Sequence, residues 1–221
     1  MPTFATPAPI SAVLDVPAGR IQVIAADRAD TSVEVRPADA ARSRDARSAE
    51  QAVVSYADGV LRLHVPEPAA RIIGAPGSVE VTVRMPAGSD LQATSGAVEV
   101  RGVGRLGDVT VDGAYRQVKI DEAASVHLTA TDGDVEIGRL TGAAEISTAR
   151  GDIRIAEAVR GTVVLRTRSG DITVAAASGV PASLDAGTDH GRVSNALRND
   201  GAPVLDIRAT TSHGDITARS L

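Results

Sequence analysis

Hydrophobic and polar positions alternate along most of this chain, and in the second half the alternation is organised into a repeat. Each of seven copies has an alternating apolar arm, a corner residue and a second alternating arm. A clear copy runs from Val126 to Ile137 and another from Val163 to Val174. The corners, 17 to 23 positions apart, are Gly96, Arg116, Gly133, Gly151, Gly170, Gly191 and Gly214. Because such alternation is typical of a strand with one packed face, each copy is predicted to fold as strand, corner, strand.

The uniform copies favour a stack of equivalent units. One unit cannot bury its apolar face alone, whereas stacked coils share a core and pair their backbones in parallel. A further bend is marked nine residues before the corner by Gly107, Ala124, Gly142 and Gly161. We therefore predict an all-β, β-helix-like solenoid with about seven C-terminal coils. The alternative is an antiparallel meander in which each Gly-Asp pair closes a hairpin.

The first half is a degenerate version of the same pattern. Strands are expected at 10–16, 20–25, 31–36, 52–56, 60–65 and 78–85, and the turn Val16-Pro-Ala-Gly19 is echoed by Met85-Pro-Ala-Gly88. Two surface insertions interrupt them: 37–51, a loop or short helix, and 66–77, whose Ile72-Ile73 pair is expected to tuck back over the stack. Residues 1–221 are thus predicted to form a single repeat domain, regular over 86–221, with the strands of 10–85 capping or continuing the stack.

Composition narrows the functional classes. One Phe, two Tyr and no Trp indicate a core of aliphatic ladders. A net charge of −5 with a single lysine, Lys119, argues against nucleic-acid binding. The absence of Cys excludes disulfides and thiolate metal sites. No apolar run reaches membrane-spanning length and no signal peptide is evident, so we expect a cytoplasmic protein that does not contact a membrane.

The two Val/Met-Pro-Ala-Gly turns, followed by iterated Ser/Thr-x-Gly-Asp-Val/Ile units, resemble a known bacterial family. This is the β-strand-repeat family named "putative adhesins", otherwise a domain of unknown function. The resemblance covers most of the chain, from about Ala12 to Ala218. It implies a surface for binding and brings no catalytic motif, so it assigns no site residues and no cofactor.

Two sets of polar residues beside the corners could ligate a metal. Carboxylates after the corner could hold Ca²⁺, although Asp following Gly more often bonds a nearby backbone N–H. His190 and His213 precede the corner in adjacent copies, beside Asp189, and could hold Zn²⁺ or Ni²⁺. We favour structural roles for both sets and for the threonines three residues before the corner. The carboxylates are Asp134, Asp152, Asp171 and Asp215, and the threonines are Thr148, Thr167, Thr188 and Thr211.

A candidate binding face lies three residues after the corner. Its charges alternate in sign, as cross-strand pairing on a solvated sheet produces: Glu99, Lys119, Glu136 and Arg154. The leading hypothesis is a non-catalytic scaffold that presents this face to an unknown protein or glycan partner. The alternative is a carbohydrate-active lyase or hydrolase, which would need a groove with at least two unpaired acids.

Two local features complete the sequence prediction. The chain finishes inside a repeat, at Ile216 to Leu221, so an open edge is expected there. Either Arg219 protects that edge or a homodimer forms through the C-terminal coil. Arg116 stands where the other copies have glycine, and we expect Gly113 to make the corner in its place.

Overall fold

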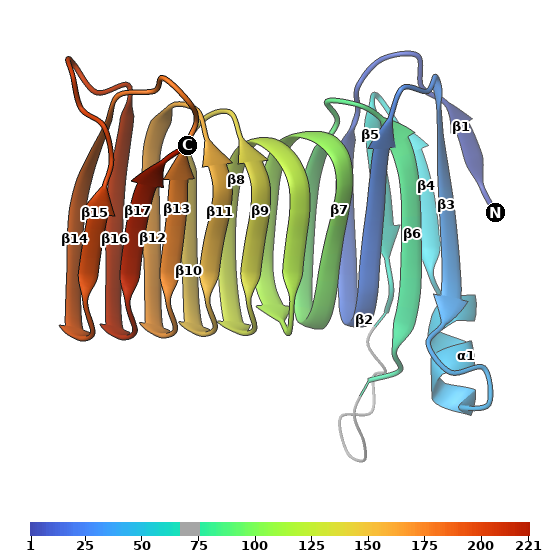
Figure 1. The fold of residues 1–221 in the computed structure, drawn as a ribbon. Coiled ribbons are helices and arrows are strands. Elements are labelled where there is room, and N and C mark those ends of the chain that lie inside the picture. The colour runs from blue at the N-terminus through green and yellow to red at the C-terminus, as the bar shows by residue number, and fades with distance from the viewer. Residues whose placement is uncertain (67–75) are drawn as a thin grey trace.

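The computed structural model describes residues 1–66 and 76–221, most of which lie in strands (Figure 1). The helix in these ranges is α1 (Ser43–Glu50). The strands are β1 (Thr3–Ala5), β2 (Ser11–Ala26), β3 (Asp30–Pro37), β4 (Val53–Ala57), β5 (Val60–His64), β6 (Val79–Pro86), β7 (Asp90–Tyr115), β8 (Val118–Asp132), β9 (Val135–Leu140), β10 (Ala144–Arg150), β11 (Ile153–Ala158), β12 (Gly161–Ser169), β13 (Ile172–Ala176), β14 (Ala182–His190), β15 (Val193–Ala196), β16 (Leu205–His213) and β17 (Ile216–Ser220).

Successive copies of the repeat stack as parallel coils. Val126, Ala144 and Val163 are direct neighbours across β8, β10 and β12, and β9, β11 and β13 pair in the same way. The arms before the corner form one sheet, the first-arm sheet (β5, β10, β12, β14, β16), and those after it form the second-arm sheet (β6, β9, β11, β13, β15, β17). β2, β7 and β8 run through a bend and contribute to both. The solenoid prediction is confirmed and the antiparallel meander is wrong.

Columns of aliphatic side chains fill the space between the two sheets. Leu128, Ile146 and Leu165 form one column and are 1%, 0% and 0% exposed. Burying one such side chain stabilises the fold by about 1.5–3 kcal/mol. The few aromatic residues lie outside these columns; Phe4 and Tyr56 pack against each other near the N-terminus. The core therefore needs no aromatic residue, as the composition suggested.

The order of coils in space differs from their order in the sequence at the C-terminal end. β16 lies between β12 and β14, because Ile207 is the neighbour of both Val163 and Leu184. In the second-arm sheet, β17 lies between β13 and β15 in the same way. Along the sequence, β14 and β15 come directly after β13, but in space they lie one coil further out. The position between is occupied by β16 and β17, which come last in the sequence. The prediction of an open edge at the C-terminal coil is wrong, since that coil has neighbours on both sides.

The N-terminal end shows the same inversion. Ala12 of β2 lies between Leu61 of β5 and Leu91 of β7, so the first coil of the sequence is also flanked on both sides. Beyond β5 and β6, the strands β4 and β3 pair in antiparallel orientation, and β1 adds to β3. Helix α1 packs against β3. Figure 1 shows β1 and α1 at one end of the molecule and β14 and β15 at the other.

Most of the expected N-terminal strands are present, and the 37–51 insertion forms a short helix, one of the two alternatives expected for it. The strands expected at 10–16 and 20–25 are one continuous strand, β2, which bends at the Pro17-Ala-Gly19 turn. The 37–51 insertion contains α1, whose Asp45 side chain is buried and accepts a hydrogen bond from the backbone N–H of Ser78 at 3.0 Å. Most of the 66–77 insertion, including Ile72-Ile73, lies outside the described residues.

Candidate binding surface

The aspartates after the corner form a ladder along the solenoid. The Asp134 carboxylate accepts a hydrogen bond from the backbone N–H of Asp152 at 2.9 Å, and Asp152 accepts one from Asp171 at 2.7 Å. Asp171 then accepts from Asp215 at 2.7 Å, and Asp215 from the backbone N–H of Arg192 at 2.9 Å. Each carboxylate thus ties its coil to the next one in space, which is the structural role expected from the sequence. The ladder follows the inverted coil order.

The threonine column plays a parallel role on the inner side of the corner. The hydroxyl of Thr167 donates to the carbonyl of Gly151 at 3.2 Å, that of Thr211 to Gly170 at 3.0 Å, and that of Thr188 to Gly214 at 3.0 Å. Thr148, Thr167 and Thr211 are 5%, 6% and 5% exposed. The column therefore points inward and satisfies corner carbonyls, and it offers no outward array for a ligand.

These hydrogen bonds argue against a metal site at the corners. The ladder carboxylates hold backbone N–H groups, and within residues 1–66 and 76–221 no three metal-ligating side chains cluster. His190 and His213 stack with ring centroids 4.8 Å apart and planes inclined by 3°. Parallel stacked rings do not direct their in-plane lone pairs to one point, so this pair is poorly arranged for sharing a metal ion.

The contact between the C-terminal coil and the coil formed by β14 and β15 is expected to depend on the ionised Asp215 carboxylate. The pKa of Asp215 is lowered, first by the backbone N–H of Arg192 and then by its guanidinium. A carboxyl with a lowered folded pKa stabilises the fold above its unfolded pKa of about 3.9, and that contribution is lost as the pH falls through the folded value. We expect Asp215→Asn to flatten the decline of stability below about pH 4. Urea unfolding against pH measures this, and an unchanged slope would contradict it.

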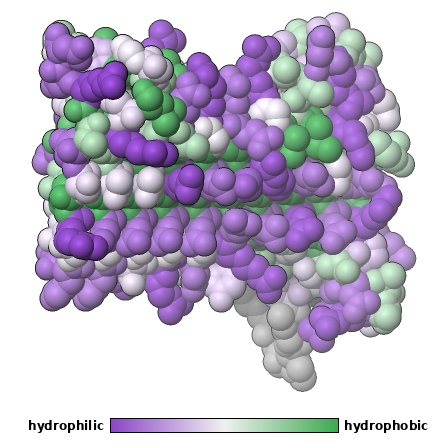
Figure 2. All heavy atoms as spheres, in the orientation of Figure 1, coloured by the Kyte–Doolittle hydropathy of each residue, from purple (hydrophilic) through white to green (hydrophobic). Residues whose placement is uncertain are grey.

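The outer face of the second-arm sheet carries rows of charge. Lys119 and Glu136 are register neighbours and form an ion pair at 2.8 Å, with Arg154 next to Glu136. Glu99 belongs to a different row: it pairs with Arg20 at 3.2 Å, while the neighbour of Lys119 is Arg101. The sequence prediction that Glu99 lies in the row of Lys119 is therefore wrong. It aligned the second arm of the first repeat copy two residues too early, and Arg101 occupies that position. Figure 2 shows rows of hydrophilic side chains running along the molecule.

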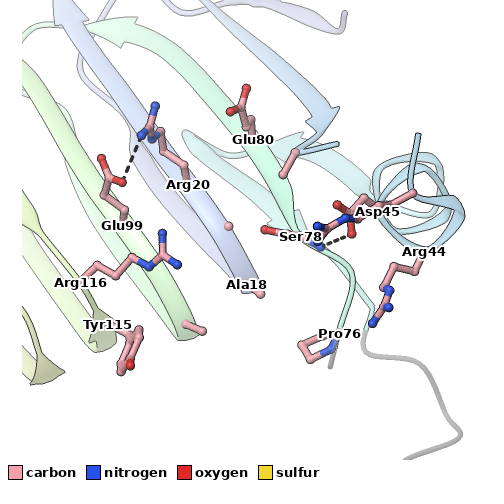
Figure 3. A pocket seen from close by; sticks show the side chains of 14 residues that line it. Ala18, Arg20, Arg44, Asp45, Pro76, Ser78, Glu80, Glu99, Tyr115 and Arg116 are labelled. Atoms are coloured by element: carbon pink, nitrogen blue, oxygen red, sulfur yellow. Dashed lines mark hydrogen bonds and ion pairs between the residues drawn. The ribbon is translucent and has the colours of Figure 1, made fainter. Parts of the chain in front are cut away.

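A groove opens where this face meets α1. Its volume is about 430 Å³, and its walls come from β2, β6, β7 and the α1 region. Tyr115, 42% exposed, lies beside Arg116, whose side chain extends toward the Arg20–Glu99 pair (Figure 3). Across the groove, Arg44 and Asp45 lie on α1. An exposed aromatic ring beside an arginine is a combination common in binding surfaces.

Arg116 adopts a backbone conformation that disfavours any side chain. Its φ is 93°, whereas Gly96 and Gly191 are outside the positive-φ group. Gly113, with φ 82°, also has positive φ, but it does not replace Arg116 at the corner, so that expectation is wrong. A non-glycine residue held there costs about 1–3 kcal/mol, and such strain is concentrated at functional sites. In the described residues no ion pair involves the Arg116 side chain, so its guanidinium does not offset that cost.

Arg116→Gly is expected to stabilise the fold. Glycine accepts positive φ without strain, which offsets its greater freedom in the unfolded chain, and the net gain should be about 1 kcal/mol. Arg116→Ala is the matched control, because it removes the same side chain and keeps the strained backbone. Chemical denaturation of the three proteins measures the difference. Equal stability of the Gly and Ala variants would show that the backbone at Arg116 is unstrained.

The fold and this surface define a β-solenoid with a grooved, charged outer face. The first and last coils of its sequence each lie between two other coils. The Toastrack DUF4097 family model matches residues 13–220. The chain belongs to this family, in agreement with the resemblance found in its sequence. No helix in the two described ranges is long and apolar enough to cross a lipid bilayer.

Solved structures resemble this chain at low sequence identity. A putative adhesin from Bacteroides fragilis NCTC 9343 is 14% identical, with a TM-score of 0.54 over 98% of this chain and 95% of that chain. A putative cell adhesion protein from Clostridium sporogenes ATCC 15579 is 9% identical, with a TM-score of 0.44 over 100% and 98% of the two chains. A search of curated proteins gave no match. The likeness to the Bacteroides fragilis protein, at this low identity, describes the fold alone.

The sequence prediction missed the groove because its residues are far apart in the chain. Arg20, Asp45 and Tyr115 come from β2, α1 and β7, and their approach depends on the inverted coil order at the N-terminal end. One signal was available: Arg116 is the one corner residue in the seven copies that is not glycine. A residue that breaks a conformational rule in an otherwise regular repeat is a candidate functional residue.

Proposed function

We propose that this chain is a non-catalytic binding module that presents the outer face of its second-arm sheet to a protein or glycan partner, with the groove at Tyr115 and Arg116 as the centre of contact. The strained, unpaired Arg116 beside the exposed Tyr115 carries this proposal. The fold holds Arg116 there at a cost in stability, which is reasonable where a partner gains from it. The Bacteroides fragilis structure, described as a putative adhesin, is in keeping with a binding role.

The acidic side chains of the groove argue against the alternative hypothesis, a carbohydrate-active lyase or hydrolase. Hydrolysis or elimination needs two carboxyl groups, or a carboxylate and a base, free to act across the groove. Glu99 is paired with Arg20 at 3.2 Å, and Asp45 is buried and accepts a hydrogen bond from Ser78. Among the described residues, Glu80 is the remaining acid in the groove wall. This arrangement suits recognition better than acid–base chemistry.

A capture experiment tests the proposal. The purified chain is used as bait against lysate of its source cells and against a glycan array, in parallel with Tyr115→Ala and Arg116→Ala. We expect a saturable ligand that both variants lose. Arg166→Ala is the control, because Arg166 pairs with Glu145 on the first-arm sheet and should leave binding unchanged. Equal binding by wild type and both groove variants would overturn the groove as the contact site.

A further inference from the structure

The end coil formed by β14 and β15 is exposed where its counterparts are buried. Leu184 and Ala186 are half-buried and Val193 is 45% exposed. Their register neighbours in the C-terminal coil are Ile207, Ala209 and Ile216, which are 0%, 0% and 1% exposed. In the described part of the chain, β14 pairs only with β16, and β15 only with β17 in the second-arm sheet. The inner positions of this coil therefore form an end of the core that is only partly covered.

This end has only part of the protection that natural sheet edges use. Natural edges are blunted by proline, charged side chains, bulges or inward-pointing charges, or are covered by a loop. The outer side of β14 carries Asp185 and Asp189. Neither β14 nor β15 contains proline or lysine, both pair without a register shift, and their inward positions are uncharged. The 197–204 segment runs beside the coil, where Arg198 accepts a hydrogen bond from Ala182 and Pro181 accepts one from Val204. At the opposite end, antiparallel strands and α1 follow the last parallel coil.

We propose that two copies of this chain associate end to end through β14 and β15. A coil end presents two strand edges at once, on opposite sides of one core. A single extended peptide could pair with one of them, whereas the same coil of a second copy matches both. The opposite end offers a poor match, because its outer strands β1 and β4 have three and five residues against nine and four in β14 and β15. The association is therefore symmetric and closes as a dimer.

The sequence of β14 is compatible with antiparallel pairing to itself. With Ala186 on the two-fold axis, Leu184 faces Thr188 on the inner side and the two cores become continuous. On the outer side Asp185 faces Gly187, so no two like charges lie directly opposite. The contact continues a hydrophobic core and supplies partners for the free backbone groups of β14 and β15. It lies at the other end of the solenoid from the groove and does not depend on the proposed function.

Sedimentation equilibrium of the full chain over a wide concentration range tests the dimer. We expect a mass of twice one chain, and dissociation about tenfold or more easier in Ala186→Lys, which places two cations together at the axis. Val53→Lys is the matched control, since Val53 is 60% exposed on β4 at the opposite end and should leave the dimer intact. A single-chain mass at the highest concentration, or a dimer that only Val53→Lys disrupts, would overturn the proposal.

Cross-linking provides a test that does not depend on a charged substitution. The chain has no cysteine, so one introduced cysteine reports on one contact. We expect Ala186→Cys to form an intermolecular disulfide under mild oxidation and Val53→Cys to form none. Cross-linking through Val53→Cys and none through Ala186→Cys would place any association at the wrong end and contradict the proposal.

Discussion

Removal of residues 205–221 is expected to unfold the C-terminal end of the solenoid. β16 and β17 lie between two coils, and their inner residues Leu205, Ile207 and Ile216 are 0%, 0% and 1% exposed. Without them, β14 and β15 lose every strand neighbour and β12 and β13 lose one side. The lost burial amounts to roughly 5–10 kcal/mol, comparable to the whole stability of many domains. Limited proteolysis with mass spectrometry should show cleavage spreading from about residue 177 onward.

A second deletion separates this prediction from the ordinary cost of shortening a solenoid. Removing residues 178–203 joins β13 to β16 through Ala177 and Val204, the same two-residue connection by which β11 reaches β12. This variant loses more residues than the truncation, but it keeps a continuous stack of coils. We expect it to fold and to resist proteolysis. If it is as unstable as the truncated chain, the C-terminal coil does not hold the position described.

Gly151→Ala is expected to destabilise the stack by about 2–4 kcal/mol. Gly151 has φ 129°, and an added Cβ would lie 2.2 Å from the carbonyl oxygen of Gly133 in the neighbouring coil. The corner must then open, and the hydrogen bond from Thr167 to the Gly151 carbonyl is disturbed as well. Chemical denaturation measures the loss.

Gly201→Ala is the matched control for the corner variant. Gly201 has no atom within 4 Å of an added Cβ and no positive φ, and it lies in the segment between β15 and β16. Its substitution should change stability by less than about 0.5 kcal/mol. Similar losses in the two variants would mean that the corner tolerates a side chain and that close coil stacking does not explain its glycine.

The strands and side-chain columns of each coil could be predicted from the sequence, but the order of the coils in space could not. The repeat revealed parallel strands, the aliphatic columns and the roles of the Asp and Thr columns, because all of these arise from contacts between equivalent positions. Coil order follows instead from how connecting segments cross between coils, and a repeat carries no information on this. One clue was present: Asn195 stands where every other copy has an aliphatic residue, and it lies in the exposed end coil.

The candidate site was only partly predictable, for a related reason. The ion pair of Lys119 with Glu136 follows from regular spacing, since both residues lie in consecutive coils at the same register. Glu99 was misplaced because the β7 coil spacing changes near the bends at Gly102 and Asp112, where the register shifts. The groove needs α1 beside the second-arm sheet. Nothing in the 37–51 composition indicated which part of the solenoid this insertion would approach.

The inverted coil order has a physical consequence for the whole molecule. In a serial solenoid each terminal coil is held on one side only and opens easily. Here the first and last coils of the sequence are flanked on both sides, so neither terminus can leave without disturbing two neighbours. A solenoid locked in this way can keep an extended face rigid, which suits a binding module.

Engineered disulfides test the coil order most directly. Thr217 is the register neighbour of both Thr173 and Ser194, whereas Thr173 and Ser194 are separated by a strand. In this cysteine-free chain, the pairs Thr173→Cys with Thr217→Cys and Ser194→Cys with Thr217→Cys should each cross-link within one molecule, and Thr173→Cys with Ser194→Cys should not. Rapid cross-linking of Thr173→Cys with Ser194→Cys, and none of Thr173→Cys with Thr217→Cys, would show that the coils follow sequence order and would contradict the account.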